Sequence, residues 1–464
     1  MKTLFQPRYI LFTAIALMVL ASCKVTQPYQ QPALPTDSLY RDVAVSDTGS
    51  IATFSWEEFF KDENLKSLIK TGLDNNPDLL TAWLRVQQAE SYLLQSRTAF
   101  FPTLNANAGA TVAKLSEAQG FGIRDNVTQY ELGLSSSWEI DVWGKLKSSR
   151  KAQAAALLQS QEGANAVKTA LVANIANLYY TLLTLDEQLA ITRQTVENWS
   201  ITVETMRELK NAGRVTEAAV VQSEAQKYAA EVTIPDLLQS IRETENRLNV
   251  LLGRNPGPIQ RTSLKAQQLP ENLETGVPAQ LLANRPDVKA AEYNYRYYFE
   301  LTNVARTAFY PTLTITGSAG LSSLEISKLL DPASFAASVG AGILQPITGR
   351  RANKTRYEVA RYQEEEAYVN FRNRLLVAGE EVSNALSLYE TAKSKIAVRT
   401  HQMAALEKSV DYSLELLQNG FANYTEVITA RQSLLMAELG SVNDRFQQIT
   451  ATIGLYRALG GGWR

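Results

Sequence analysis

The chain has 464 residues, of which 45% are hydrophobic and 20% charged, and its 46 basic and 47 acidic side chains nearly balance. These proportions are ordinary for a folded protein. They argue against a nucleic-acid-binding protein, because such domains are usually strongly basic. One cysteine cannot form an intrachain disulfide and is a poor metal site. The only histidine, His401, lies within a helical pattern and is expected to be a solvent-exposed helix residue.

Residues 1–22 have the pattern of a secretory signal peptide. Lys2 and Arg8 supply positive charge, and the apolar run 9–20 has 12 residues, fewer than the roughly 20 that a membrane-spanning helix needs. Without residues 1–22 the chain keeps 44 basic and 47 acidic residues, a formal charge of −3. No later segment has 18 uninterrupted apolar residues, so no transmembrane helix is expected.

The only cysteine, Cys23, directly follows the signal peptide. Leu20-Ala21-Ser22-Cys23 resembles the bacterial lipobox, which implies cleavage before Cys23 and acylation of its thiol, as by palmitate, and of its new amino group. Cys23 is therefore expected to be a lipid anchor. The alternative is an ordinary signal peptide followed by an accidental cysteine. By the same resemblance, the absence of aspartate at Lys24 favours the outer over the inner membrane.

The sequence after about residue 60 is duplicated. Four pairs of landmarks recur in the same order at nearly constant spacing: Pro77 and Pro286, and Pro102 and Pro311, are 209 residues apart, Gly144 and Gly349 are 205 apart, and Gly213 and Gly420 are 207 apart. Collinear landmarks of this kind indicate an internal duplication. The expected organisation is an extended N-terminal segment, a first repeat, a linker marked by Pro and Gly, and a second repeat, at 23–60, 61–255, 256–276 and 277–464.

Each repeat opens with a helical stretch that begins at Pro77 or Pro286, where the missing N–H costs nothing. Pro102 and Pro311 are expected to end these helices, and the apolar period then changes from 3.6 to 2. Amphipathic strands are expected at about 102–116, 127–142, 311–324 and 333–347. Their polar faces carry mainly Ser, Thr, Asn and Gly. A soluble sandwich with a wet face and the strands of a membrane barrel both fit this pattern.

Long helical hairpins are expected at about 145–252 and 350–459. Apolar residues recur there every seven positions, which predicts a left-handed coiled coil; in the second repeat they are Leu375, Val382, Tyr389, Ile396, Met403, Val410 and Leu417. Each hairpin turns back at a glycine, Gly213 or Gly420, which suits a helix end that needs positive φ. Pro235 is expected to bend the first return helix or to remove one hydrogen bond.

Candidate chemistry is sparse. Arg285, Pro286 and Asp287 are expected to set the start of a helix, where Asp287 suits the helix dipole. Glu139 and Asp141 could mimic an acid/base pair, but their position before Gly144 favours a strand-to-helix junction. The sequence contains no nucleophile–base pair, phosphate-binding loop or metal-ligand cluster, so we expect neither enzymatic activity nor a cofactor.

Several motifs together resemble the TolC-type outer membrane efflux proteins, in the lipoprotein subgroup of RND efflux systems. Besides the lipobox, they lie at 138–145, 251–257, 281–288, 309–313 and 455–463. The resemblance covers nearly the whole chain. Independently of it, four strands cannot close a barrel in lipid, because an open edge leaves backbone groups unpaired. Several copies must therefore pool their strands.

The resemblance implies a mostly α-helical fold with a membrane β-barrel: a homotrimer that shares 12 strands in the outer membrane and continues as a helical tunnel into the periplasm. It also implies a passive exit duct for drugs (multidrug efflux) or other small molecules, working with a periplasmic adaptor (membrane fusion) protein and an inner-membrane RND-type pump. The adaptor is expected to dock at the hairpin tips, which are Gly213, Arg214, Gly420, Phe421, Ala422 and Asn423. Ala422 departs from relatives in which an aspartate of an acidic constriction can stand there.

Two other classes of protein are weighed. A periplasmic adaptor also combines a lipid anchor with a helical hairpin, but the four strands and the duplication disfavour it. A cell-envelope enzyme is disfavoured by the missing catalytic constellations.

Overall fold

The computed structural model describes residues 25–36, 39–41, 50–114, 126–268, 275, 278, 280–347 and 349–464. The chain forms two compact units, and each unit takes residues from both sequence repeats. Unit 1 comprises Met1–Ala33, Arg85–Ser160 and Ala291–Phe371, and unit 2 comprises Leu34–Leu84, Gln161–Ala290 and Arg372–Arg464.

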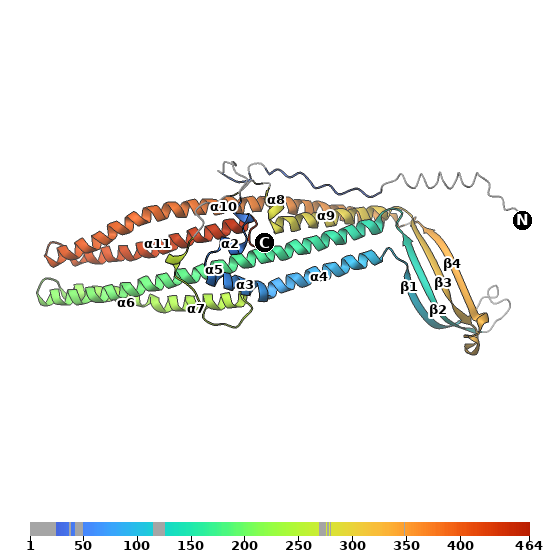
Figure 1. Cartoon of the computed structure of the whole chain (residues 1–464), viewed down its shortest axis with the longest axis horizontal. Helices are drawn as coiled ribbons and strands as arrows, with labels where there is room; N and C mark the ends of the chain where they lie inside the picture. The colour runs from blue at the N-terminus through green and yellow to red at the C-terminus, as the bar shows by residue number, and fades with distance from the viewer. Residues whose placement is uncertain are drawn as a thin grey trace. The chain divides into compact units, whose positions relative to one another are not determined.

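Unit 1 contains a four-stranded antiparallel sheet in the order β1-β2-β3-β4 (Figure 1). Its strands are β1 (Thr103–Lys114), β2 (Asn126–Ile140), β3 (Thr312–Ser323) and β4 (Phe335–Leu344). Within the described residues β1 pairs only with β2 and β4 only with β3, so both are edge strands. The sheet of one chain therefore has two open edges.

The two faces of this sheet differ in polarity, because side chains alternate along each strand. The register places most of the large apolar residues on one face, among them Leu104, Val112, Leu132, Leu134, Ile315, Phe335, Val339 and Ile343. The other face carries Asn105, Asn107, Ser135, Ser137, Thr314, Thr316, Ser318 and Ser338. Val339 is 88% exposed in the single chain. An apolar face of this size indicates contact with an apolar environment.

The first repeat supplies the helices α4 (Pro77–Thr98), α5 (Lys145–Asn211), α6 (Glu217–Glu231) and α7 (Thr233–Leu251). The return arm of its hairpin is two helices, interrupted at Val232. Pro235 is the third residue of α7, where a backbone N–H has no partner within the helix. The disturbance expected from Pro235 thus takes the form of a one-residue interruption at Val232, three residues before the proline.

The second repeat supplies α9 (Pro286–Thr307), α10 (Arg350–Gln418) and α11 (Tyr424–Ala458). In unit 2, α10 lies beside α11, and α5 lies beside α6 and α7 (Figure 1). The shorter elements are η1 (Ile51–Thr53), α2 (Trp56–Phe59), α3 (Glu63–Asn75), η2 (Leu264–Ala266), α8 (Gln280–Asn284), η3 (Ile326–Lys328) and η4 (Pro332–Ser334).

The seven-residue apolar repeat marks buried helix faces. Leu375, Val382 and Ile449 are each at most 2% exposed, as a coiled-coil seam requires. No helix within the described residues is both long and apolar enough to cross a membrane. The expected fold class, mostly α-helical with four amphipathic strands and an internal duplication, is confirmed.

Candidate functional site

The first hairpin tip turns back at Gly213, just after α5. Gly213 has a φ of +71°, which glycine adopts without a Cβ clash. Its N–H donates to the carbonyl oxygen of Lys210 at 2.8 Å, and the N–H of Arg214 donates to the carbonyl oxygen of Leu209 at 2.8 Å. Together these bonds make a Schellman motif, which satisfies carbonyl groups that the helix end leaves unpaired.

The second tip repeats this backbone at Gly420, which has a φ of +80°. The N–H of Gly420 donates to Leu417 at 3.0 Å, and the N–H of Phe421 donates to Leu416 at 2.9 Å. A Cβ at either Gly213 or Gly420 would meet no atom within 4 Å. Glycine at the tips is therefore required by the backbone conformation and not by crowding.

The return helices begin differently at the two tips. Asn423 accepts from the N–H of Thr425 at 3.3 Å, while the Glu426 carboxylate accepts from the N–H of Asn423 at 3.4 Å, so α11 starts with a capping box. Thr216, at the corresponding position of α6, makes no side-chain capping bond. The start of α11 is therefore the better satisfied of the two.

The tip side chains differ most at the residue after each glycine. The Phe421 side chain is 83% exposed. At the corresponding position, Arg214 donates from Nη1 to the carbonyl oxygen of Gln418 at 2.7 Å. This contact joins the first tip to the C-terminal end of α10, where the helix dipole favours a cation. Ala422 is half-buried and Asn423 is exposed.

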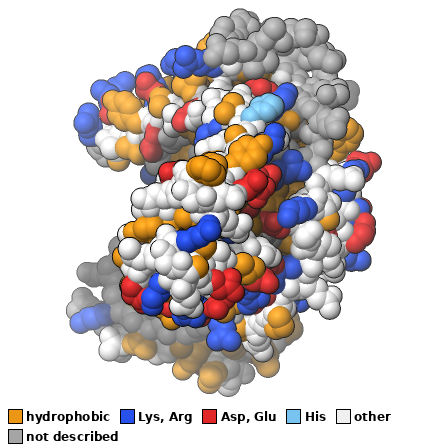
Figure 2. Space-filling view, turned by 90° about the vertical axis from the view of Figure 1, so that its left-hand side faces the viewer, with side chains coloured by type: hydrophobic (Ala, Val, Ile, Leu, Met, Phe, Trp, Pro, Cys, Tyr) orange, Lys and Arg blue, Asp and Glu red, His pale blue; other side chains and the backbone are white. Residues whose placement is uncertain are grey.

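One apolar cluster lies beneath both tips. Its buried members come from α5, α6, α10 and α11 and are Met206, Ala219, Val220, Leu417 and Val427. Because all four helices contribute, the two hairpins present their tips as one surface. Figure 2 looks onto the tip end and shows hydrophobic patches between acidic and basic side chains.

Several charged residues near the tips lie close to a residue of opposite sign. Glu224 and Glu217 of α6 pair with Arg207 and Lys210 of α5. On the second hairpin, burial lowers the pKa of the Arg431 guanidinium, and the negative charge of Asp411 opposes that shift. The charge of Asp411 on α10 therefore acts on a basic residue of α11.

The residues of the β2–α5 junction have structural partners. The Asp141 carboxylate accepts from the N–H groups of Leu146 at 3.0 Å and Lys147 at 2.8 Å, and so caps α5. Glu139 pairs with Lys145 at 3.0 Å. Asp141 therefore caps a helix and Glu139 forms an ion pair. Each carboxylate has its own partner, as expected for a strand-to-helix junction.

The landmark prolines and glycines lie at element boundaries. Pro77 and Pro286 are the first residues of α4 and α9, and Pro102 and Pro311 directly precede β1 and β3. Gly144 has a φ of +80°. Gly349 directly precedes α10 but is not among the glycines with positive φ. The two strand-to-helix junctions therefore differ.

Arg285 is a buried structural residue. Its guanidinium donates to the Asp287 carboxylate at 2.7 and 3.0 Å, to Glu381 at 2.6 Å and to the carbonyl oxygen of Ala458 at 2.9 Å. Burial alone would raise the pKa of the Asp287 carboxyl, but Arg285 and Arg374 outweigh it and hold that pKa below its ordinary value. The cluster ties the start of α9 to α10 and to the end of α11.

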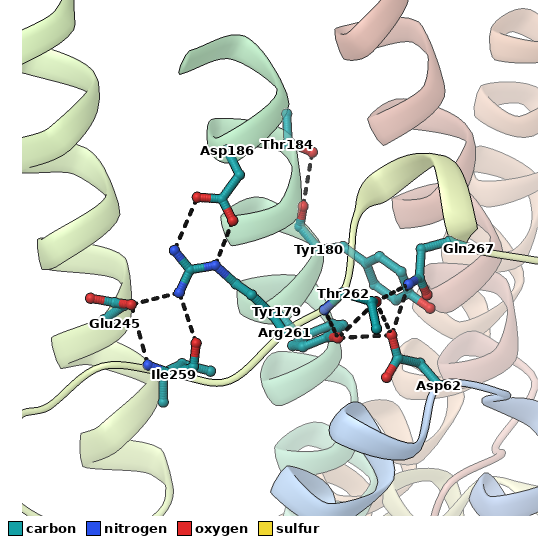
Figure 3. A network of polar contacts seen from close by, with 10 residues as sticks. All are labelled: Asp62, Tyr179, Tyr180, Thr184, Asp186, Glu245, Ile259, Arg261, Thr262 and Gln267. Atoms are coloured by element: carbon teal, nitrogen blue, oxygen red, sulfur yellow. Dashed lines mark hydrogen bonds and ion pairs between the residues drawn. The ribbon is translucent and has the colours of Figure 1, made fainter. Parts of the chain in front are cut away.

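The segment 256–268, expected only as a linker, is held by a polar network that the sequence does not reveal (Figure 3). Arg261 donates to Asp186 at 2.5 and 3.0 Å and to Glu245 at 2.6 Å. Thr262 and Gln267 donate to the Asp62 carboxylate at 2.5 and 2.7 Å. The partners are 75 or more residues away in sequence, or lie on other elements, so no local motif marks them.

Two remaining expectations concern the anchor and metals. Cys23 lies outside the described residues. Among the residues that are described, no group of three or more His, Cys, Asp and Glu could hold a metal ion. His401 is exposed on α10.

The chain is similar to known proteins over nearly its whole length. A family model described as "Outer membrane efflux protein" matches residues 68–254 and 277–461, one match in each repeat. A "Probable outer membrane lipoprotein SilC" of Salmonella typhimurium is 27% identical over 98% of both chains. "Cation efflux system protein CusC" of Escherichia coli (strain K12) is 26% identical over 96% of this chain and 97% of its own.

Solved structures agree with these relatives. A structure of CusC is 26% identical and superposes with a TM-score of 0.83, covering 95% of this chain and 100% of that chain. The outer-membrane channel OprN is 23% identical, with a TM-score of 0.88 and coverage of 95% and 100%. The similarity to OprN supports the fold alone.

Proposed function

The chain belongs to the outer membrane efflux protein family, and from this premise we propose that it is the passive exit duct of a tripartite pump. It is an outer membrane channel component of an efflux system that extends into the periplasm. The main observation in support of a duct is the sheet of unit 1, which has one apolar face, one polar face and two open edges.

The open edges of β1 and β4 support assembly from several copies. In lipid, each unpaired backbone group costs several kcal/mol, so the edges need partners. Three copies would contribute 12 strands and close a barrel, with the apolar face toward lipid and the polar face toward water. The homotrimer remains our proposal and rests on this pairing requirement.

We propose that the helical hairpins of unit 2 form the periplasmic part of the duct. Their tips offer a partner an exposed aromatic side chain, Phe421, and the backbone turns at Gly213 and Gly420. Exposed aromatic residues over a rigid apolar cluster are typical anchors of protein interfaces. We assign Gly213, Arg214, Gly420, Phe421, Ala422 and Asn423 to docking of a periplasmic adaptor.

We propose that the pump, and not the duct, selects the cargo. The names of relatives refer to cations, to solvents and to toluene, so the same duct fold serves different efflux systems. The polar face of the sheet carries small uncharged residues for most of its length, which suits a wide passage without strong selection. We propose drugs or other small molecules as cargo, an inner-membrane RND-type pump as the energy source, and no enzymatic step in the duct itself.

Accumulation of cargo in cells tests this function. The gene is deleted in the native host, and retention of dyes, drugs, solvents and metal cations is measured with and without a plasmid copy. We expect several-fold higher retention of at least one class in the deletion strain, reversed by the plasmid. Unchanged retention of every class would contradict a duct role.

A further inference from the structure

Two short segments of unit 1, residues 145–151 and 350–356, are unusually basic. Each contains four Lys or Arg residues and no Asp or Glu, although the whole chain has a formal charge of −1. The duplication relates them, since each directly follows a junction glycine, Gly144 or Gly349, and they lie 205 residues apart. We call them the basic segments. Their basic residues are Lys145, Lys147, Arg150, Lys151, Arg350, Arg351, Lys354 and Arg356.

Helix stability does not explain this positive charge. The basic segments are the first seven residues of α5 and of α10, and neither helix has an acidic residue in its first turn. The helix dipole favours anions at this end of a helix and disfavours cations. Residues that break a local rule in both repeats, without a gain in stability, indicate a function.

Most of these basic side chains have no partner of opposite charge. Three of the eight form ion pairs, namely Lys145 with Glu139, Lys151 with Glu300 and Lys354 with Glu358. Within the described part of the chain the other five form no ion pair, and all are exposed: Lys147, Arg150, Arg350, Arg351 and Arg356. A surface with such an excess of positive charge attracts an anionic partner.

The two basic segments begin at the same end of the sheet. α5 follows β2 and α10 follows β4, and both strands pair with β3. Ile140 at the end of β2 lies opposite Leu313, and Leu344 at the end of β4 lies opposite Thr312. Because neighbouring strands lie about 4.8 Å apart, these two strand ends are about 10 Å apart. The positive charges of the two segments therefore act on the same surroundings.

Exposed apolar and aromatic residues directly precede the basic segments. Ile347, before α10, is 86% exposed, and Val142, before α5, is 38% exposed. Trp143 donates from Nε1 to the carbonyl oxygen of Pro311 at 2.7 Å, and its ring lies 5.0 Å from the Tyr310 ring. Tryptophan and tyrosine are enriched at the boundary between lipid tails and water. The order of apolar sheet, aromatic residues and basic segment thus matches that of lipid tails, interface and headgroups.

We propose that the basic segments bind the anionic headgroups of phospholipids in the leaflet at the helical end of the sheet. Phosphate oxygens would accept hydrogen bonds from the guanidinium groups, which suit phosphate geometry, while the lysines act as point charges. The acyl chains of the same lipids would lie along the apolar face of the sheet. This binding holds the starts of α5 and α10 at the headgroups and so fixes the depth of the sheet. The proposal rests on the proposed function, in which the apolar face contacts lipid.

The relative affinity of the protein for two lipids tests the proposal. The native assembly is reconstituted in bilayers of phosphatidylcholine and phosphatidylglycerol at several ratios, and one of the two lipids carries brominated acyl chains. Bromine quenches the fluorescence of tryptophans at the lipid boundary, such as Trp138 and Trp143 beside the basic segments. The dependence of quenching on lipid ratio gives the ratio of the two binding constants.

Variants with equal loss of charge are compared. The junction variant carries Lys147→Gln, Arg350→Gln, Arg351→Gln and Arg356→Gln. The control variant carries four substitutions at exposed sites further along α5 and α10, which are Arg193→Gln, Arg372→Gln, Lys393→Gln and Lys408→Gln. A third variant keeps the positive charge at the junction through Arg350→Lys, Arg351→Lys and Arg356→Lys.

We expect the unaltered protein to bind phosphatidylglycerol about fivefold more strongly than phosphatidylcholine, which is the effect of about one basic side chain at a membrane surface. The junction variant should bind both lipids equally, while the control variant and the charge-keeping variant should retain the preference. In the unaltered protein the preference should weaken as salt rises from about 0.01 M to about 1 M, because the Debye length falls from about 30 Å to about 3 Å. This salt dependence tests the proposal even if the junction variant does not fold.

Three results would overturn the proposal: no lipid preference in the unaltered protein, an unchanged preference in the junction variant, or an equal loss in the junction and control variants, which would show an effect of net charge alone. An unchanged preference together with higher cargo retention in cells would assign the basic segments to the passage instead. Failure of the proposed function is distinct, because neither brominated lipid would then quench the tryptophans beside the sheet.

Discussion

The hydroxyl of Tyr179 in α5 donates a hydrogen bond to the carboxylate of Asp62 at 2.8 Å, although 117 residues separate them. The same carboxylate accepts from Thr262 and Gln267 of the segment between the repeats (Figure 3). Its other oxygen accepts from the N–H of Leu65 and so caps α3. Burial raises the pKa of Tyr179 to about 12, so this hydroxyl remains a donor at all physiological pH values. One carboxylate thus joins α3 and α5 of the first repeat to the segment between the repeats.

Asp62 should make the free energy of unfolding decrease as the pH falls into the acid range. Burial alone would raise the pKa of its carboxyl, but bonds from Thr262, Gln267 and Tyr179 outweigh this and lower it. A lowered folded-state pKa gives stability above the unfolded value of about 4, and this stability is lost as pH falls further. We expect Asp62→Asn to reduce the unfolding free energy at pH 7 by about 1–2 kcal/mol.

The apparent Tm of the Asp62→Asn protein is measured at pH 7 and below pH 4, with Asp74→Asn on the exposed side of α3 as control. The difference in apparent Tm between the Asp62→Asn protein and the unaltered protein should be smaller at acid pH. A gap that stays constant or widens would show that the Asp62 charge does not carry the effect.

Arg285 should be among the most costly residues to remove. It is 5% exposed at its side chain and pairs with both Asp287 and Glu381. Removing one partner of a buried ion pair costs about 3–5 kcal/mol, because charge is left unpaired. We expect Arg285→Ala to lower the apparent Tm strongly and to reduce the yield of folded protein, and we expect little effect of Arg356→Ala at an exposed site. Equal Tm values for the two variants would contradict the structural role.

Two strand glycines should differ in how well they tolerate an added methyl group. At Gly320 a Cβ would lie 2.5 Å from the carbonyl oxygen of Leu132 and 2.6 Å from the Cα of Gly133, whereas at Gly342 it would meet nothing within 4 Å. Backbone atoms cannot move aside cheaply, so Gly320→Ala should lower the heat stability of the assembled protein and Gly342→Ala should not. The melting of oligomers extracted from membranes checks this, and a larger loss for Gly342→Ala would refute the register described.

Substitution of Phe421 should impair docking of the adaptor without affecting folding. Because its side chain is 83% exposed, Phe421→Ser should change the unfolding free energy by no more than about 0.5 kcal/mol. We expect it nevertheless to raise cargo retention in cells several-fold, through loss of the adaptor contact. Val398→Ser, at a 69% exposed site on α10 away from the tip, is the control. Normal efflux by the Phe421→Ser protein would remove Phe421 from the docking site.

Local patterns in the sequence predicted the fold class. They did not predict contacts between residues that are far apart in the sequence. Spacing by seven marked Leu375 and Val382 as buried, and two-residue alternation predicted the four strands, because both periods come from local geometry. The interruption at Val232 had no comparable signal, since Pro235 alone does not show where a helix ends.

The candidate site likewise has features that the sequence predicted and contacts that it did not. Gly213 and Gly420 could be assigned to the tips from the duplication. The bond from Arg214 to Gln418, the network around Asp62 and the Asn303–Gln27 contact join residues 204, 200 and 276 positions apart. Nothing in the residues near any of these positions indicates its partner.

The most direct test of the duct is the mass of the native assembly extracted from purified outer membranes, corrected for bound detergent. The open edges of β1 and β4 require strands from other copies, so we expect three times the mass of one processed chain. A monomer that retains the folded sheet, or a protein found only in the inner membrane, would contradict the account.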